Sequence, residues 1–181
     1  MNSLFDFIVE PVGQRYNNEI KVGDKSLVIN TKLETFKSVN NIAKVISIPK
    51  AFKTPIKPGD LIMIHHNVFR RFYDMKGREK NSRAFFKDNL YFVQIDQVYL
   101  YKPQEKWLSF GDRCFLAPIK DFNEVDTGLE QKLIGILKYG NSALEALGIN
   151  EGDLVGFRPF GEFDFVVEGK RLYCMKSNDI V

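Results

Sequence analysis

Apolar residues occur along the chain in short runs, most of them bounded by Gly, Pro, Asp or Asn. The runs are rich in β-branched and aromatic residues, and their lengths are typical of strands. Only Ser142–Leu147, with a serine at its start and Gly148 after its end, has the pattern of a helix. The predicted strands are Phe5–Val9, Ser26–Ile29, Ile42–Ile48, Leu61–Ile64, Leu90–Ile95, Val98–Tyr101, Cys114–Leu116, Leu133–Leu137, Leu154–Phe157, Phe163–Val167 and Leu172–Met175. Many short strands separated by turn signals predict an all-β fold, a small barrel or sandwich.

An internal repeat is the most informative feature of the sequence. The segment IKPGDLI at Ile56–Ile62 recurs 93 residues later as INEGDLV at Ile149–Val155. Upstream, Phe7–Pro11 matches Cys114–Pro118 at an offset of 107. Downstream, Leu90 and Tyr91 match Leu172 and Tyr173 at an offset of 82.

The changing offsets locate two insertions in the first copy. The offset falls from 107 to 93 and then to 82, so the first copy has 14 extra residues before its Gly-Asp turn and 11 after it. Insertions of this kind are tolerated between strands, where they lie on the surface. The polar segment Lys102–Lys106 separates the copies, and we predict two domains, residues 1–102 and 107–181.

Taken in order, the segments of each copy resemble the chaperonin-10 family of GroES-type co-chaperonins, in a tandem double-domain form. Gly111–Pro118 is similar to the family's opening strand D-R-V-x-V-x-P, and Asp6–Pro11 is a looser match. The turn and strand V-K-x-G-D-x-V-x-F are similar to Ile56–Ile64 and Ile149–Phe157. The second strand and the closing tail are similar to Asn41–Pro49 and Leu90–Tyr101 in the first copy, and to Ile134–Gly140 and Leu172–Val181 in the second.

The resemblance implies two tandem GroES-like small β-barrels in one chain. A protein of this family caps a large ATP-driven chaperonin ring of the GroEL type and assists protein folding. It associates with itself into a ring, and the nucleotide chemistry belongs to the partner. The resemblance therefore implies a cytoplasmic protein, or one of the host cytoplasm if viral, that is not an enzyme and needs no cofactor.

Residues 13–40 are predicted to be a long mobile loop in the first copy. Its opening is polar, and an isolated apolar cluster, Leu27, Val28 and Ile29, is followed by further polar residues. In the family, a short hydrophobic tripeptide in this loop docks on the chaperonin, which would make these three the docking residues. The alternative is that Ser26–Ile29 is an edge strand packed on its own barrel. The shortened loop of the second copy, 119–132, has no such cluster, so one docking loop per chain is expected.

Residues 65–89 form an unusually basic segment, with seven Lys and Arg against three Asp and Glu. In the family this position holds the hairpin that roofs the ring. Three interpretations stay open: a solvated hairpin with its aromatics folded over the barrel, a basic surface for a partner, or a nucleic-acid surface on which aromatics stack on bases. The roof residues singled out are Arg70, Arg71, Phe72, Tyr73, Arg78 and Arg83.

Composition argues against most enzyme classes. No nucleophile motif, Gly-rich phosphate loop or metal signature occurs, so we expect no catalytic residues and no metal site. His65 and His66, the only histidines, are expected on opposite faces of a strand, where they cannot chelate one metal together. Cys114 and Cys174 are expected to be small buried hydrophobes. The chain has no apolar run long enough for a membrane span and no basic leader at Met1–Glu10, so neither a membrane nor a signal peptide is expected.

Two rival functions remain from the sequence. One is a structural or assembly ring protein, possibly viral, that reuses the GroES-like barrel without a chaperonin and keeps Leu27–Ile29 internal. The other is a nucleic-acid-binding β-barrel that uses the basic segment, for which binding should fall steeply with salt. The net charge of the whole chain is only +3, so we do not expect nucleic acid to be the main partner.

Overall fold

The computed structural model describes residues 3–16, 19–22, 25–28, 38–120 and 130–181. The chain divides into two compact units, Met1–Lys106 and Trp107–Val181, and each is described by itself. Strands dominate both units, and the described residues contain one α-helix, α1 (Ser142–Ala146). The prediction of an all-β fold is thus confirmed at the level of fold class.

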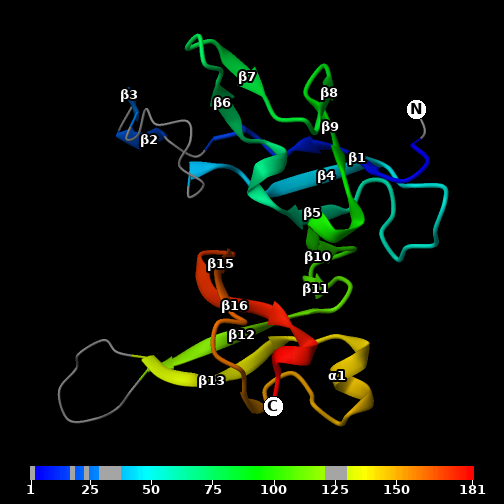
Figure 1. Ribbon diagram of the computed structural model, residues 1–181, viewed down its shortest axis with the longest axis vertical. Coiled ribbons are helices and arrows are strands. Elements are labelled where there is room, and N and C mark those ends of the chain that lie inside the picture. Colours follow the sequence, from blue (N-terminus) through cyan, green and yellow to red (C-terminus); the bar gives the residue numbers. More distant parts are fainter. Residues whose placement is uncertain (1–2, 17–18, 23–24, 29–37, 121–129) are drawn as a thin grey trace. The chain divides into compact units, whose positions relative to one another are not determined.

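The first unit is built on one antiparallel sheet with the strand order β10-β5-β4-β1-β9-β8 (Figure 1). Two further hairpins, β2–β3 and β6–β7, pair only within themselves among the described residues. Short 3-10 helices, η2 (His66–Val68) and η3 (Ile95–Gln97), follow β5 and β9. The strands are β1 (Phe7–Pro11), β2 (Glu19–Val22), β3 (Lys25–Val28), β4 (Ile42–Ser47), β5 (Leu61–Ile64), β6 (Arg71–Tyr73), β7 (Glu79–Asn81), β8 (Phe85–Lys87), β9 (Leu90–Val93) and β10 (Val98–Lys102).

The second unit has an antiparallel sheet with the order β14-β13-β12-β16-β15. Helix α1 lies between β13 and β14, and the 3-10 helix η4 (Ser177–Asp179) follows β16. Asn141 caps α1 by accepting a bond from the Leu144 N–H, so the cap lies one residue before the serine expected from sequence. The strands are β11 (Leu108–Ser109), β12 (Arg113–Lys120), β13 (Glu130–Tyr139), β14 (Leu154–Gly156), β15 (Phe163–Val167) and β16 (Lys170–Lys176).

The two sheets repeat the same topology. If β5, β4, β1, β9 and β8 are matched to β14, β13, β12, β16 and β15, the strand order is the same in both units. The register repeats as well: Val9 pairs with Val45 in the first unit, and Leu116 pairs with Leu137 in the second. A bulge follows Ile8 in β1 and also follows the matching Phe115 in β12. The sequence repeat therefore corresponds to a repeated fold.

The Gly-Asp turns are the closest point of similarity between the units. Gly59 and Gly152 have φ angles of +96° and +98°, a region that residues with a Cβ rarely adopt. Each turn also places its aspartate so that one carboxylate oxygen accepts a backbone N–H from three residues earlier. The matching bonds are Gly59 N–H to Val45 O and Gly152 N–H to Leu137 O, both 2.8 Å, and Lys57 N–H to Asp60 Oδ2 at 2.8 Å and Asn150 N–H to Asp153 Oδ2 at 2.7 Å.

Each unit has its own core, built at matching positions. In the second unit a buried cluster lies between the sheet and α1, and Ile149 and Ile180 pack against it. Its members are Cys114, Leu116, Leu137, Leu144, Val155, Phe157, Tyr173 and Met175. Most of the matching positions of the first unit are buried too: Phe7, Val9, Val45, Ile62, Ile64, Tyr91 and Val93.

The sheets of the described residues are open and are not closed into barrels: β8 is an outer strand of the first sheet, and β14 and β15 are the outer strands of the second. Ile180 extends the second sheet by an isolated bridge to Phe157, at the position where β10 begins to pair with β5 in the first unit. No helix in the described part of the chain has the length and apolar character needed to cross a membrane.

Candidate functional site

The β2–β3 hairpin carries the predicted docking cluster. Leu27 and Val28 lie on β3, opposite Ile20 and Glu19 of β2, and Ile29 lies outside the described residues. Among the described residues β3 pairs with β2 alone and adds no strand to the main sheet of its unit. The alternative in which Ser26–Ile29 is an edge strand of that sheet therefore has no support from the strand pairing.

The stem of this insertion is fixed by hydrogen bonds. Tyr16 forms an isolated antiparallel bridge with Val39, and the Asn40 N–H donates to the Arg15 carbonyl at 2.9 Å. The buried Asn40 amide also donates to the carbonyls of Val12 (2.8 Å) and Gln14 (2.9 Å). Buried polar groups satisfied in this way hold a single geometry. The segment of the chain that contains β2 and β3 thus starts and ends at a closed stem.

Arg15 of the stem clamps the chain that follows η2. Its guanidinium donates twice to the Phe69 carbonyl, at 2.8 and 3.2 Å, and once to Asn81 Oδ1 at 2.8 Å. It also lies 5.1 Å from the centre of the Tyr91 ring, a cation–π contact. Burial lowers the pKa of Arg15, although an arginine stays charged at any physiological pH. The stem and the basic segment are therefore joined by a half-buried charge.

Tyr16 makes a second connection between the two insertions. Its hydroxyl accepts the Arg71 N–H at 2.6 Å, and the Arg71 guanidinium lies 5.1 Å from the centre of its ring. Sequence reasoning placed Arg15 in a mobile polar loop and did not single out Tyr16. Their partners are 54 to 66 residues away, and no local pattern in the sequence identifies such contacts.

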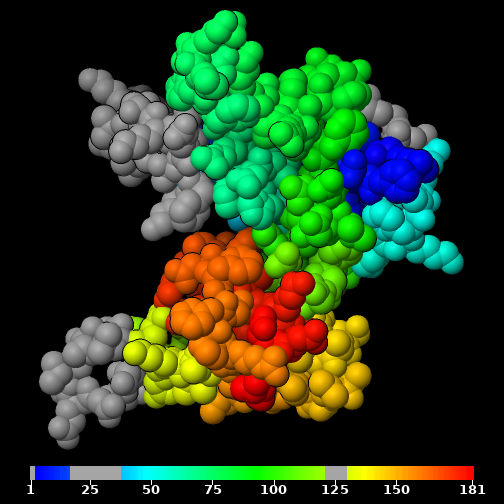
Figure 2. Space-filling view, in the orientation of Figure 1, coloured from blue at the N-terminus to red at the C-terminus, as the bar shows by residue number. Residues whose placement is uncertain are grey.

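The β6–β7 hairpin occupies the middle of the predicted roof segment and stands out from the surface of the first unit (Figure 2). Asp74 closes its turn: its carboxylate accepts the N–H groups of Lys76 and Arg78, both at 2.9 Å, and the Arg78 Nε–H at 3.1 Å. The backbone bond from Arg78 is the main reason that the pKa of Asp74 is lowered. Across the strands, Arg71 pairs with Glu79 at 2.8 Å.

The aromatic residues of the basic segment divide into two groups. Phe69 is fully buried with its ring centre 4.9 Å from that of Tyr91, and Phe85 contacts the same tyrosine edge-on at 5.5 Å. By contrast, Phe72 and Tyr73 on β6 are 42% and 48% exposed. Phe85 and Phe86 are 36% and 39% exposed as well, so Phe69 alone is fully withdrawn from a ligand.

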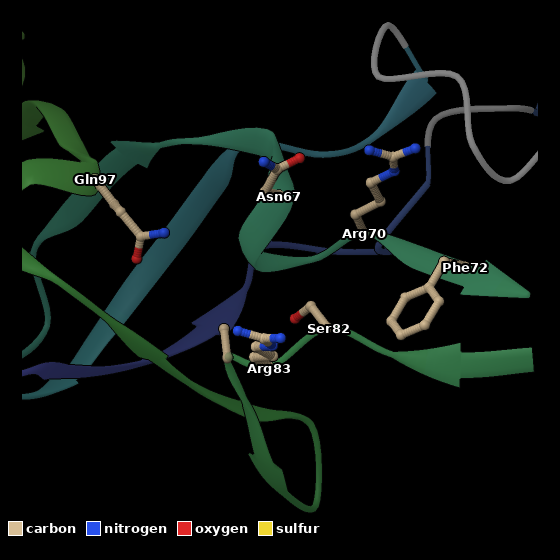
Figure 3. A pocket seen from close by; sticks show the side chains of 7 residues that line it. Asn67, Arg70, Phe72, Ser82, Arg83 and Gln97 are labelled. Carbon is tan, nitrogen blue, oxygen red and sulfur yellow. The ribbon is translucent and has the colours of Figure 1, made fainter. Parts of the chain in front are cut away.

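Arg70, Phe72 and Arg83 line one pocket of about 400 Å³ (Figure 3). Arg70 lies between η2 and β6, and Arg83 lies between β7 and β8, so two separate stretches of the basic segment form the walls. The remaining lining residues are Asn67, Ser82, Ala84 and Gln97. We call this space the arginine pocket.

The expected arrangement of the two histidines is wrong. The strand β5 ends at Ile64, and His65 caps η2 with its Nδ1 accepting the Asn67 N–H at 3.1 Å. The two rings stack with their centres 4.3 Å apart, because the chain turns between them instead of continuing as a strand. Burial, followed by the proximity of His65 and Arg70, lowers the pKa of His66 to about 4. His66 is therefore neutral at pH 7.

In the second unit, the described residues 157–162 between β14 and β15 form no hairpin that corresponds to β6–β7. The polar cluster of this unit lies instead at the start of β13, where Glu130 accepts bonds from Tyr173 and Arg171, and Arg171 also pairs with Asp164 at 2.8 Å. Burial and the bond to Glu130 raise the pKa of Tyr173 to about 12. These contacts connect β13 to β15 and β16, and they pair the charged groups of the cluster with one another.

Neither cysteine has the environment of a reactive thiol. Cys114 and Cys174 are buried and unbonded to each other, and burial raises the pKa of both thiols to about 12. Their prediction as small buried hydrophobes agrees with this. Within the described ranges, no three His, Cys, Asp or Glu side chains come together in a way that could hold a metal ion.

A scan against protein-family models finds no match to this chain, and a search of curated proteins finds none either.

Proposed function

We propose that the protein is a co-chaperonin, with two GroES-like units in one chain, that caps a large ATP-driven chaperonin ring. The observation that carries the proposal is the β2–β3 hairpin, which holds Leu27 and Val28 on a strand outside the main sheet and is attached through a closed stem. A hairpin outside the main sheet that carries adjacent apolar residues suits docking into an apolar groove on a partner. The repeat of strand order and register supports the tandem form.

Ring formation belongs to the same proposal. Leu154 on the outer strand β14 is 65% exposed, and open strand edges pair readily with other chains. Self-association would place several β2–β3 hairpins on one ring, and the chaperonin would bind them together through effective concentration. No step of catalysis is assigned to the protein itself.

The test is a capping experiment with a purified chaperonin ring and ATP, monitored by electron microscopy and by chaperonin ATPase activity. Burying one aliphatic side chain contributes about 1.5 to 3 kcal/mol, so Val28→Asp should weaken docking at least about tenfold per hairpin. Val166→Asp is the matched control, because Val166 lies on β15 and is 57% exposed. We expect this control to cap like the wild type.

Two results would contradict the proposal. If the wild type forms rings but neither caps a chaperonin nor changes its ATPase activity, the protein is an assembly ring protein. If Val28→Asp lowers the melting temperature strongly while Val166→Asp does not, the cluster stabilises the fold of the first unit and is not a docking element.

A further inference from the structure

The four arginines singled out in the basic segment fall into two classes. Arg71 and Arg78 each pair with a carboxylate of the β6–β7 hairpin, Glu79 and Asp74 respectively. Arg70 and Arg83 have no carboxylate partner among the described residues, and both line the arginine pocket. Guanidinium groups in one pocket attract an anion when no carboxylate of the described residues neutralises them.

The other polar groups of the pocket also favour an anion. No carboxylate lines it, while Asn67 and Gln97 contribute carboxamide groups that can donate hydrogen bonds. The Gln97 oxygen already accepts the Gln94 N–H at 3.0 Å, which leaves its amino group to donate.

One wall of the pocket is aromatic. Phe72 enters from β6 with its ring toward the space between the two walls, and it is 42% exposed (Figure 3). The volume of about 400 Å³ lies within the range of small-molecule sites, about 300 to 1,000 Å³, and exceeds the need of a bare inorganic ion. An aromatic face beside unpaired guanidinium groups suits a ligand that joins a planar ring to an anion.

We propose that the arginine pocket binds a small phosphate monoester that carries a planar ring, of the nucleoside monophosphate class, with the ring against Phe72 and the phosphate between the walls, where the side chains of Arg70 and Arg83 would turn toward it. This site is separate from the β2–β3 hairpin and does not rest on the proposed capping function. Val28→Asp should therefore leave ligand binding unchanged.

The test titrates the full chain with adenosine monophosphate, inorganic phosphate and adenosine, at fixed ionic strength, by calorimetry and by NMR. We expect saturable binding of adenosine monophosphate, competition by inorganic phosphate, and at least tenfold weaker binding of adenosine. The double variant Arg70→Gln/Arg83→Gln should weaken adenosine monophosphate at least tenfold. Arg78→Gln is the matched control, since it removes a charge of the same segment outside the pocket, and it should stay within twofold.

A second variant keeps the test informative if the double variant unfolds. Phe72→Ala should weaken adenosine monophosphate severalfold and leave inorganic phosphate unchanged, because only the ring contact is lost. The proposal is overturned if adenosine binds as tightly as its monophosphate, or if Arg78→Gln weakens binding as much as the double variant. It is also overturned if single-stranded oligonucleotides bind with affinity that rises with their length while the mononucleotide does not bind, since the basic segment would then be a nucleic-acid surface.

Discussion

The two units are built on the same sheet and differ in what is inserted into it. Strand order, register, a bulge and the Gly-Asp turn repeat between them. In the first unit, the β2–β3 hairpin separates β1 from β4, and η2 and the β6–β7 hairpin separate β5 from β8. In the second, residues 157–162 alone connect β14 to β15. The shared strands therefore determine the fold, and the candidate functional residues lie in the insertions of one unit.

The insertions of the first unit are also attached to each other. Arg15 and Tyr16 from the first insertion bond to the backbone at Phe69 and Arg71 in the second. Loop insertions usually vary independently of one another. Here a change at Arg15 or Tyr16 should also affect the second insertion, while a change within the β2–β3 hairpin should not.

The largest effect is expected from removing the β2–β3 hairpin. Replacing residues 17–37 by a short Gly-Ser linker should abolish chaperonin capping, because the whole docking cluster is lost. Melting temperature should change little, since the bridge between Tyr16 and Val39 closes the stem. Replacing residues 121–129 of the second unit in the same way should leave capping intact. Equal loss of capping in both variants would mean that the two units dock alike.

The next effect concerns the clamp between the insertions. Arg15→Met removes three hydrogen bonds from a charged donor and a cation–π contact, and should lower the free energy of unfolding by about 3 kcal/mol. Chemical denaturation measures this. Arg78→Met is the control, because its pair with Asp74 is exposed and should contribute under about 0.5 kcal/mol. A similar loss in both variants would argue against a special role for Arg15.

A smaller effect is expected from a substitution at a position where the two sheets carry different residues. Ala43 pairs with Pro11 in the first unit, and Gly135 pairs with Pro118 at the matching register in the second. A Cβ on Gly135 would lie 3.0 Å from Leu116 Cβ and 3.1 Å from the Ala117 carbonyl oxygen. Gly135→Ala should therefore destabilise the second unit by about 2 kcal/mol, measured by denaturation. An unchanged stability would show that β12 and β13 have room to separate.

The smallest effect is a dependence on pH that only the first unit should show. The pKa of His66 is about 4 in the folded chain and near 6.5 in the unfolded chain, because burial disfavours its charged form. The unfolded state therefore binds the extra proton between these values, and stability should fall as the pH decreases from 7 toward 4. After allowance for solvent screening, the loss is about 1 kcal/mol.

His66→Gln should remove that part of the pH dependence, measured as the difference in unfolding free energy from the wild type at pH 7 and pH 4.5. The second unit contains no histidine, so its stability gives the background from carboxylates. If the variant follows the wild type over this range, His66 is already protonated in the folded chain.

Much of the sheet could be predicted from the sequence because its strands are short apolar runs, and most of them are largely buried. Leu61–Ile64 and Phe163–Val167 were predicted with the bounds that the structure has. The strands β6, β7 and β8 were missed, since each has three residues and all but Arg71 are exposed, which leaves no apolar alternation to detect. The repeat was found, but the register of β4 against β13 was not, because the second copy has one residue more than the first between this strand and the Gly-Asp turn.

The candidate site was harder to predict than the fold. The basic segment was identified by its charge, yet charge alone did not separate the paired Arg71 and Arg78 from the unpaired Arg70 and Arg83. That division depends on which carboxylates the β6–β7 turn brings near, and it is a property of the tertiary structure. Gln97 was missed for the same reason, because it reaches the pocket from η3.

Because the register repeats, a strand of one unit could pair with a strand of the other during folding. The side chains on the shared strands disfavour this exchange. Because β12 has the same hydrogen-bonding pattern as β1, it can compete with β1 for β9 in a newly made chain, which is a route to strand-exchanged chains. In the native pairs, Phe7 faces Val93 while Cys114 faces Met175, and all four are buried. An exchanged chain would bring Phe7 against Met175, which overfills the core, and Cys114 against Val93, which leaves a void. Complementary volumes thus give each strand a preferred partner that backbone geometry alone does not.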